Sequence, residues 1–166
     1  AAQSAEGNQE MVIIFAAGND GSSGSSSINP PGSAKNVICV GASENVQSIG
    51  GTDGSGINDS GANSADDIAD FSSRGPCQDG RQKPDLVAPG THVSGGVFQV
   101  ANPGPTGEAD SCFTGEGVSG GPSGSLFFPL GQQYFSASSG TSHSTPAVAG
   151  GAALLRQYFI NQGMPV

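Results

Sequence analysis

Ser142 follows Gly140 and Thr141 at the predicted start of an apolar helix, and its hydroxyl is the group in this sequence best placed for covalent chemistry. The first N–H groups of a helix have no partner within the helix, and they lie at the positive end of the helix dipole. A serine there has its own backbone N–H available to hold a negatively charged oxygen. Ser142 is therefore a candidate nucleophile for acyl transfer.

Asn19 is the candidate for a second donor to the same oxygen. It comes directly after an apolar run, residues 11–17, which we expect to form a central strand of a parallel sheet that is buried on both faces. Open α/β sheets bind ligands beyond the carboxyl ends of their strands, where the Asn19 amide would lie. Each signal alone is weak, since Gly-Thr-Ser and Asn-Asp-Gly also form ordinary turns.

The other apolar segments predict the rest of an α/β fold within one domain, residues 1–166. Residues 36–40 read as a second buried strand, residues 83–90 as a short strand flanked by prolines, and residues 93–100 as a weakly alternating segment. Two long polar or glycine-rich excursions, at about 48–70 and 101–133, separate these elements. The second excursion is expected near the active-site face.

A helix is predicted from about residue 142 to 160, with Pro146 in its first turn, where a missing N–H costs nothing. The spacing of its larger apolar residues places them on one face. These residues are Val148, Ala152, Leu155 and Phe159. Glycines and alanines keep this helix slim, so we expect it to pack in the middle of the protein.

Composition excludes some classes of protein. A formal net charge of -9 with five Lys and Arg residues argues against a nucleic-acid surface, which needs clustered cations. No apolar run approaches the roughly 18 to 20 residues that span a bilayer, so we expect a soluble chain. The sequence begins at Ala1 without a basic and apolar leader, so we expect any signal peptide to be absent from it.

Three cysteines leave two readings of the thiol chemistry. Cys39 lies in an apolar run and is expected to be a buried free thiol. Cys77 and Cys112 lie in polar loops, where they could pair in an oxidising compartment or remain free.

Four motifs occur in one order along the chain: Phe-Ala-Ala-Gly-Asn at 15–19, Phe-Ser-Ser-Arg-Gly-Pro at 71–76, Lys-Pro-Asp-Leu-Val-Ala-Pro-Gly at 83–90, and Ser-Gly-Thr-Ser-His-Ser-Thr-Pro-Ala-Val-Ala-Gly at 139–150. This order resembles the subtilisin-like serine proteases, the subtilases of peptidase family S8. The resemblance implies a three-layer α/β fold with a parallel sheet, of which the N-terminal strands and helices are absent from this sequence.

The resemblance also implies roles for named residues. Ser142 would be the nucleophile and the Asn19 side chain an oxyanion donor, with residues 30–33 closing the far end of the S1 pocket. The residues implied in substrate binding are Ala16, Ala17, Gly18, Gly140 and Thr141. A polypeptide would be the substrate, and no cofactor would be required.

The triad is where the sequence departs from the subtilase pattern. In subtilases the chain order is Asp, His, Ser, and the first two precede the Ala-Gly-Asn strand. The two histidines here are His92 and His143, and neither stands in the family's Gly-Thr-His-Val-Ala-Gly context. The His143 side chain should point about 100° away from that of Ser142. We therefore expect a C-terminal part of a catalytic domain, almost inactive without the N-terminal half.

Oxygen-rich residues in the first excursion could bind a structural calcium ion, as subtilase loops often do, although their spacing matches no EF-hand. The carboxylates are Asp53, Asp59, Asp66, Asp67 and Asp70, with Asn58 and Asn63 beside them. The alternative is a solvated acidic loop.

Three functions remain open on these grounds. The first is a secreted or extracellular serine endopeptidase, and the second is a non-catalytic pseudoprotease domain that binds or scaffolds. The third is a sedolisin, a family that also starts this helix with Gly-Thr-Ser and often continues with Ser-Thr-Pro. It expects an Asp as the oxyanion group and a Glu as the base, so Asn19 and the Phe-Ser-Ser-Arg-Gly-Pro segment argue against it. An exposed sheet edge also predicts self-association of this chain.

Overall fold

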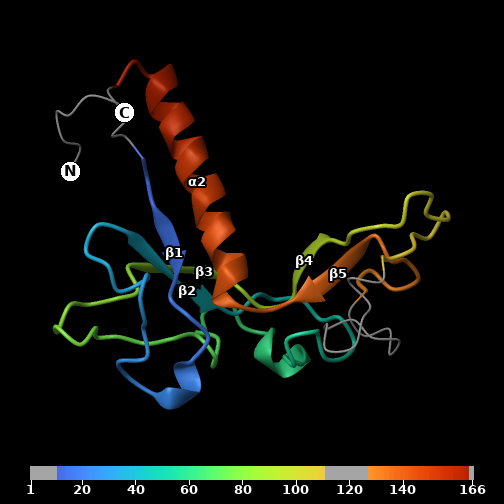
Figure 1. Cartoon of the computed structure of the whole chain (residues 1–166), viewed down its shortest axis with the longest axis horizontal. Coiled ribbons are helices and arrows are strands. Elements are labelled where there is room, and N and C mark those ends of the chain that lie inside the picture. The colour runs from blue at the N-terminus through green and yellow to red at the C-terminus, as the bar shows by residue number, and fades with distance from the viewer. Residues whose placement is uncertain (1–10, 111–126, 165–166) are drawn as a thin grey trace.

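The computed structural model describes residues 11–110 and 127–164. Three parallel strands, β1 (Ile14–Ala16), β2 (Ile38–Ser43) and β3 (Leu86–Pro89), form a sheet in the order β1-β2-β3. The long helix α2 (Thr141–Asn161) packs against all three strands (Figure 1). The predicted α/β class with a parallel sheet is therefore confirmed.

The centre of the sheet is β2, where Cys39, Val40 and Ala42 are fully buried. The run at 11–17 was expected to be central, but within the described residues β1 pairs only with β2 and forms an edge. Met11 and Val12 are 72% and 61% exposed because no described strand lies outside β1 to cover them.

The predicted helix at 142–160 is confirmed, with one more residue at each end. Because α2 begins at Thr141, Pro146 is its sixth residue and lies beyond the first turn, contrary to the prediction. The missing N–H of Pro146 then leaves the carbonyl of Ser142 without its usual helical donor.

The surroundings of α2 also differ from the expectation of a helix in the middle of the protein. Of the predicted apolar face, Val148, Ala152 and Phe159 are partly buried, whereas Leu155 is 54% exposed, contrary to the prediction. Leu154 and Tyr158 on other sides are 75% and 57% exposed. Within the part of the chain that the structure describes, the sheet covers one side of α2 and leaves the rest open.

A second sheet joins β4 (Val93–Gly96) to β5 (Phe135–Ser138) in antiparallel pairing, with Val93 opposite Ser138. β5 was not predicted, and the excursion at 101–133 lies between these two strands. Figure 1 shows this pair beside the end of α2 from which the helix begins, with its connection projecting away from the sheet. β5 thus leads the chain directly into the turn that carries Ser142.

The polar excursion at 48–70 is folded onto the protein by short turns. The 3-10 helices η1 (Gly21–Ser23) and η2 (Asp59–Gly61) are the short helices of the described chain, and Asn58 caps η2 by accepting from the Ser60 N–H at 3.0 Å. None of the described helices combines the length and apolar character needed to cross a membrane.

Cys39 is the buried free thiol that was expected, and burial raises its pKa to about 11. Cys77 is also buried and carries a free thiol, and Cys112 lies outside the described residues. The structure therefore shows no disulfide at Cys77, and a Cys77–Cys112 pair stays a prediction.

Candidate active site

The turn between β5 and α2 presents Ser142 at the surface. Ser142 is exposed, and Thr141 beside it is 1% exposed. The Gly140 N–H donates to the Gly90 carbonyl oxygen at 2.7 Å, which ties the turn to the end of β3. The Ser142 N–H has no partner among the described residues, as expected of a donor at the start of a helix.

The Asn19 amide has an orientation set by Thr141. Its Oδ1 atom accepts from the Thr141 N–H and from the Thr141 hydroxyl, each at 2.9 Å. Since both groups donate, Oδ1 faces Thr141 and Nδ2 must face away from it. A Cβ atom on Gly140 would lie 3.4 Å from Nδ2, so the amide nitrogen borders the nucleophile turn. Nδ2 has no partner within the described chain, so two free N–H donors flank this turn.

The predicted substrate-binding residues are partly brought together. The Gly18 N–H donates to the Thr141 hydroxyl at 3.3 Å, which joins two of them to the Ser142 turn. A Cβ on Gly32 would lie 2.9 Å from the Ala16 carbonyl oxygen, so the segment at 30–33 lies against Ala16. Its role at the end of an S1 pocket stays a prediction. Ala17, in contrast, is 2% exposed, and its side chain belongs to the hydrophobic core.

His143 lies beside the nucleophile but bonds elsewhere. Its Nε2 atom is 3.0 Å from the Ser138 hydroxyl oxygen. Burial lowers the pKa of His143 below its ordinary value, and the charge of Asp53 opposes that shift. No hydrogen bond joins His143 to Ser142, in agreement with the expectation that its ring points away.

His92 is fully buried, and both of its ring nitrogens are engaged. Nδ1 lies 2.7 Å from the Gln47 carbonyl oxygen and Nε2 lies 3.0 Å from the Ile57 carbonyl oxygen. The Asp59 carboxylate lies 3.7 Å from Nδ1. Neither histidine therefore contacts Ser142 as a base.

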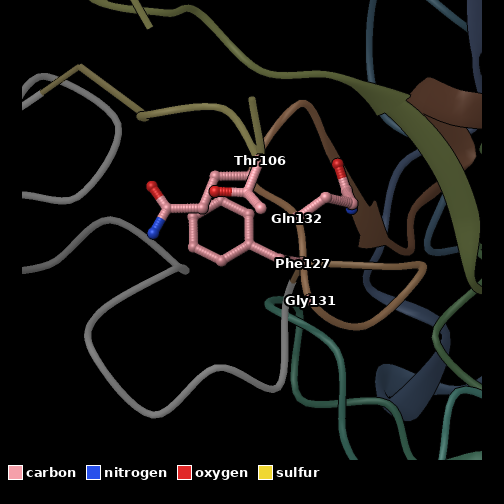
Figure 2. A pocket seen from close by; sticks show the side chains of 5 residues that line it. Thr106, Phe127, Gly131 and Gln132 are labelled. Carbon is pink, nitrogen blue, oxygen red and sulfur yellow. The ribbon is translucent and has the colours of Figure 1, made fainter. Parts of the chain in front are cut away.

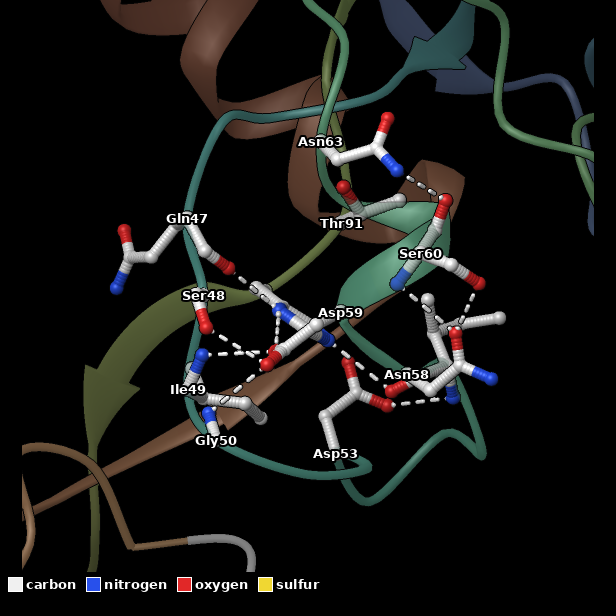
Figure 3. Close-up of polar contacts among 12 residues, drawn as sticks. Gln47, Ser48, Ile49, Gly50, Asp53, Asn58, Asp59, Ser60, Asn63 and Thr91 are labelled. Carbon is white, nitrogen blue, oxygen red and sulfur yellow. Dashed lines mark hydrogen bonds and ion pairs between the residues drawn. The ribbon is translucent and has the colours of Figure 1, made fainter.

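The aspartates of the first excursion do not converge on a metal site. Within the described ranges, no three His, Cys, Asp or Glu side chains form a group that could hold an ion. Asp59 accepts from the Ser48 hydroxyl at 2.6 Å and from the Ile49 and Gly50 N–H groups, and the first two bonds hold its pKa low (Figure 3). The exposed members of the predicted set are Asp66, Asp67 and Asp70.

A small hollow lies on the projecting connection between β4 and β5 (Figure 2). Phe127 and Thr106 line it, together with the turn at Gly131, Gln132 and Gln133. None of the residues predicted for catalysis or substrate binding lines this hollow, so it adds nothing to the site around Ser142.

Sequence reasoning missed the contact between the first excursion and the nucleophile turn. The Ser139 hydroxyl donates to Asp53 Oδ2, and the Ser55 hydroxyl donates to the Ser139 carbonyl oxygen at 2.7 Å. Asp53 was predicted only as a possible calcium ligand, and no local pattern indicated that residues 86 positions apart would meet.

Comparison with known proteins agrees with the motifs. The subtilase family profile (peptidase S8) matches residues 1–165. The serine protease AprX of Bacillus subtilis (strain 168) is 34% identical over 147 residues, which cover 89% of this chain and 26% of AprX. The serine protease/ABC transporter B family protein tagD of Dictyostelium discoideum is 35% identical over 98 residues, 59% of this chain and 4% of tagD.

Among solved structures, the prenylagaramide maturation protease PagA overlays with a TM-score of 0.51 at 24% identity, over 95% of this chain and 36% of PagA. That likeness supports the fold. The profile match over residues 1–165 establishes that this chain belongs to the subtilase family of serine proteases. The chain spans about a quarter of the length of AprX.

Proposed function

We propose that this chain is the nucleophile-bearing part of a subtilisin-like serine endopeptidase, in which Ser142 attacks the scissile carbonyl of a polypeptide. The observation that carries the proposal is the pair of free donors at the turn. Thr141 donates two hydrogen bonds to Asn19 Oδ1, so Nδ2 faces away from Thr141. Nδ2 and the Ser142 N–H are then both available to a tetrahedral oxyanion.

The general base must come from outside this sequence. His92 bonds two carbonyl groups and His143 bonds Ser138, so neither activates Ser142. A serine without a base is a poor nucleophile at neutral pH. We propose that an N-terminal part of the catalytic domain supplies the Asp and His, and that the protein acts outside the cell.

Fluorophosphonate labelling of the full-length protein at neutral pH tests this function, because the probe reports an activated serine without knowledge of the substrate. We expect labelling that disappears in Ser142→Ala. Labelling that persists in Ser142→Ala contradicts the assignment of the nucleophile.

A non-catalytic pseudoprotease domain is the second candidate, and the observation in its favour is that no base in the described chain faces Ser142. A folded full-length protein that does not react with the probe would support this candidate. An upstream Asp-Thr/Ser-Gly segment and a His-Gly-Thr-His segment in the same gene would favour the protease.

A further inference from the structure

The loop that contains Asp53 and Ser55 is bonded to the residue from which the nucleophile turn departs. Ser139 lies at the end of β5, three residues before Ser142, and it is 7% exposed. Both its side chain and its backbone bond to this loop. Ser139 is therefore the point where the first excursion meets the proposed active site.

The hydroxyl of Ser139 bridges two segments. It donates to Asp53 Oδ2 and accepts from the His92 N–H at 2.9 Å. The His92 ring in turn bonds the Gln47 and Ile57 carbonyl oxygens on the same loop. The loop, the start of β4 and the end of β5 are thus joined through one hydroxyl.

The backbone of Ser139 is held by Ser55. The Ser55 hydroxyl donates to the Ser139 carbonyl oxygen at 2.7 Å, and the Ser139 N–H lies 3.1 Å from the same hydroxyl oxygen. Ser55 Oγ is also 3.0 Å from Ser138 Oγ, which bonds His143. These contacts restrain the peptide groups on both sides of Ser139.

Asp53 is a buried carboxylate whose oxygens accept hydrogen bonds from its own loop and from Ser139. It is 4% exposed, and its Oδ1 atom accepts from the Ser55 N–H at 2.9 Å and the Ile57 N–H at 3.0 Å. A buried carboxylate must be hydrogen-bonded to be tolerated, so Oδ2 needs the Ser139 hydroxyl. One oxygen of the Asp53 carboxylate bonds to N–H groups of its own loop, and the other bonds to Ser139. The conformation of this loop is therefore coupled to the position of Ser139.

We propose that Asp53 and Ser55 are positioning residues, which hold Ser139 and thereby set the orientation of the Ser142 turn. This inference rests on the proposed protease function. A shift of about 1 Å in a reacting group can lower the rate about a hundredfold. Because Ser142 is three residues after Ser139, a displacement of Ser139 would also displace the Ser142 hydroxyl.

Two buried serines on either side of Ser142 provide a matched test. Ser139→Ala removes the bridging hydroxyl. Ser144→Ala removes a hydroxyl that is also buried, in the first turns of α2, but has no partner. In the full-length protein we expect Ser139→Ala and Asp53→Asn to lower kcat about ten- to a hundredfold with KM nearly unchanged. Ser144→Ala should keep the wild-type kcat.

A double-mutant cycle and hydrogen exchange complete the experiment. Because Asp53→Asn and Ser139→Ala disrupt one shared bond, the double variant should be no slower than the slower single variant. Amide exchange should accelerate at residues 53–57 and 139–141 in Ser139→Ala but not in Ser144→Ala.

The results separate this inference from the protease function. A wild-type protein that fluorophosphonate does not label contradicts the function itself. A labelled wild type with Ser139→Ala as fast as Ser144→Ala, or with unchanged exchange at residues 53–57, overturns the positioning role.

Discussion

The amide of Asn19 is oriented by a neighbour that is far away in the sequence. Thr141 donates to its Oδ1 atom from both the backbone and the side chain, so the amide nitrogen faces away without the cost of ordering it during catalysis. The same residue accepts from the Gly18 N–H. At the residue scale, Thr141 therefore links the ends of β1 and β5.

The first prediction concerns the Asn19 amide. If Nδ2 stabilises the oxyanion, Asn19→Ala in the full-length protein should lower kcat about a hundred- to a thousandfold. This is a rise of about 2.7 to 4 kcal/mol in activation free energy, the loss measured for such an amide in a subtilisin of the same family. KM should change little, because the bond forms with the transition state. Steady-state peptide hydrolysis measures both constants, with Asp20→Ala as the neighbouring control, and an equal loss in both variants would contradict the role.

The second prediction concerns the buried hydroxyl of Ser144, which has no hydrogen-bond partner. Replacing a buried polar group that is unsatisfied removes its desolvation cost, so Ser144→Ala should raise the free energy of unfolding by about 1 kcal/mol. Urea denaturation measures this change. A loss of stability would show that the hydroxyl finds a partner in solution.

The third prediction follows from the lowered pKa of His143, which burial causes. The unfolded ring titrates near 6.5, so below that pH the unfolded state binds the proton first and is favoured. The free energy of unfolding therefore falls as the pH drops below about 6.5, and it stops falling once the pH is below the folded pKa. Above about pH 6.5 this contribution of His143 is absent. Denaturation at pH 5 and pH 8 should show a smaller difference for His143→Gln than for the wild type.

At the scale of elements, the buried and half-buried aspartates of the first excursion bond to groups of the protein itself. Asp53 accepts from two backbone N–H groups and Ser139, and Asp59 accepts from the backbone at Ile49 and Gly50. The carboxylate oxygens of these two aspartates thus accept hydrogen bonds from the protein itself. The elements that carry the site, β1, β5 and α2, meet at the end of the sheet where this loop lies.

The fourth prediction is that calcium does not stabilise this loop. Asp53 and Asp59 are engaged, and the other aspartates of the predicted set do not gather with them in the described structure. The melting temperature of the chain should be the same in millimolar CaCl2 and in EDTA. A rise in calcium that Asp53→Asn abolishes would restore the metal-site hypothesis.

At the scale of the whole molecule, apolar surface remains open on the helix and at the β1 edge. Met11, Leu154 and Tyr158 are each more than half exposed. In the proposed protease, the N-terminal part of the catalytic domain would cover these groups. In this chain alone, they favour contact with a second copy.

The fifth prediction is therefore self-association of the isolated chain. An unpaired strand edge beside an apolar helix face invites pairing. Sedimentation velocity at micromolar concentrations should show concentration-dependent dimers or larger species, and Leu154→Glu should shift them toward monomer. A monomer at every concentration would contradict this prediction.

The family, the parallel sheet and the helix could be predicted from the sequence, because short apolar runs and the Gly-Thr-Ser helix start are local patterns that do not depend on distant contacts. It also indicated Ser142 and Asn19, whose motifs are contiguous. It did not indicate β5, which is a short segment with only a partial apolar pattern.

Which polar groups meet depends on contacts between distant segments and could not be predicted from the sequence. Asp53 and Ser139 carry no mutual signal along the chain, and their bond exists because β4 and β5 fold the nucleophile turn back against the first excursion. The burial of His92 and the exposure of α2 were likewise settled by packing. Local sequence patterns report which side chains favour a strand or helix, whereas hydrogen bonds between distant segments depend on how those elements are assembled.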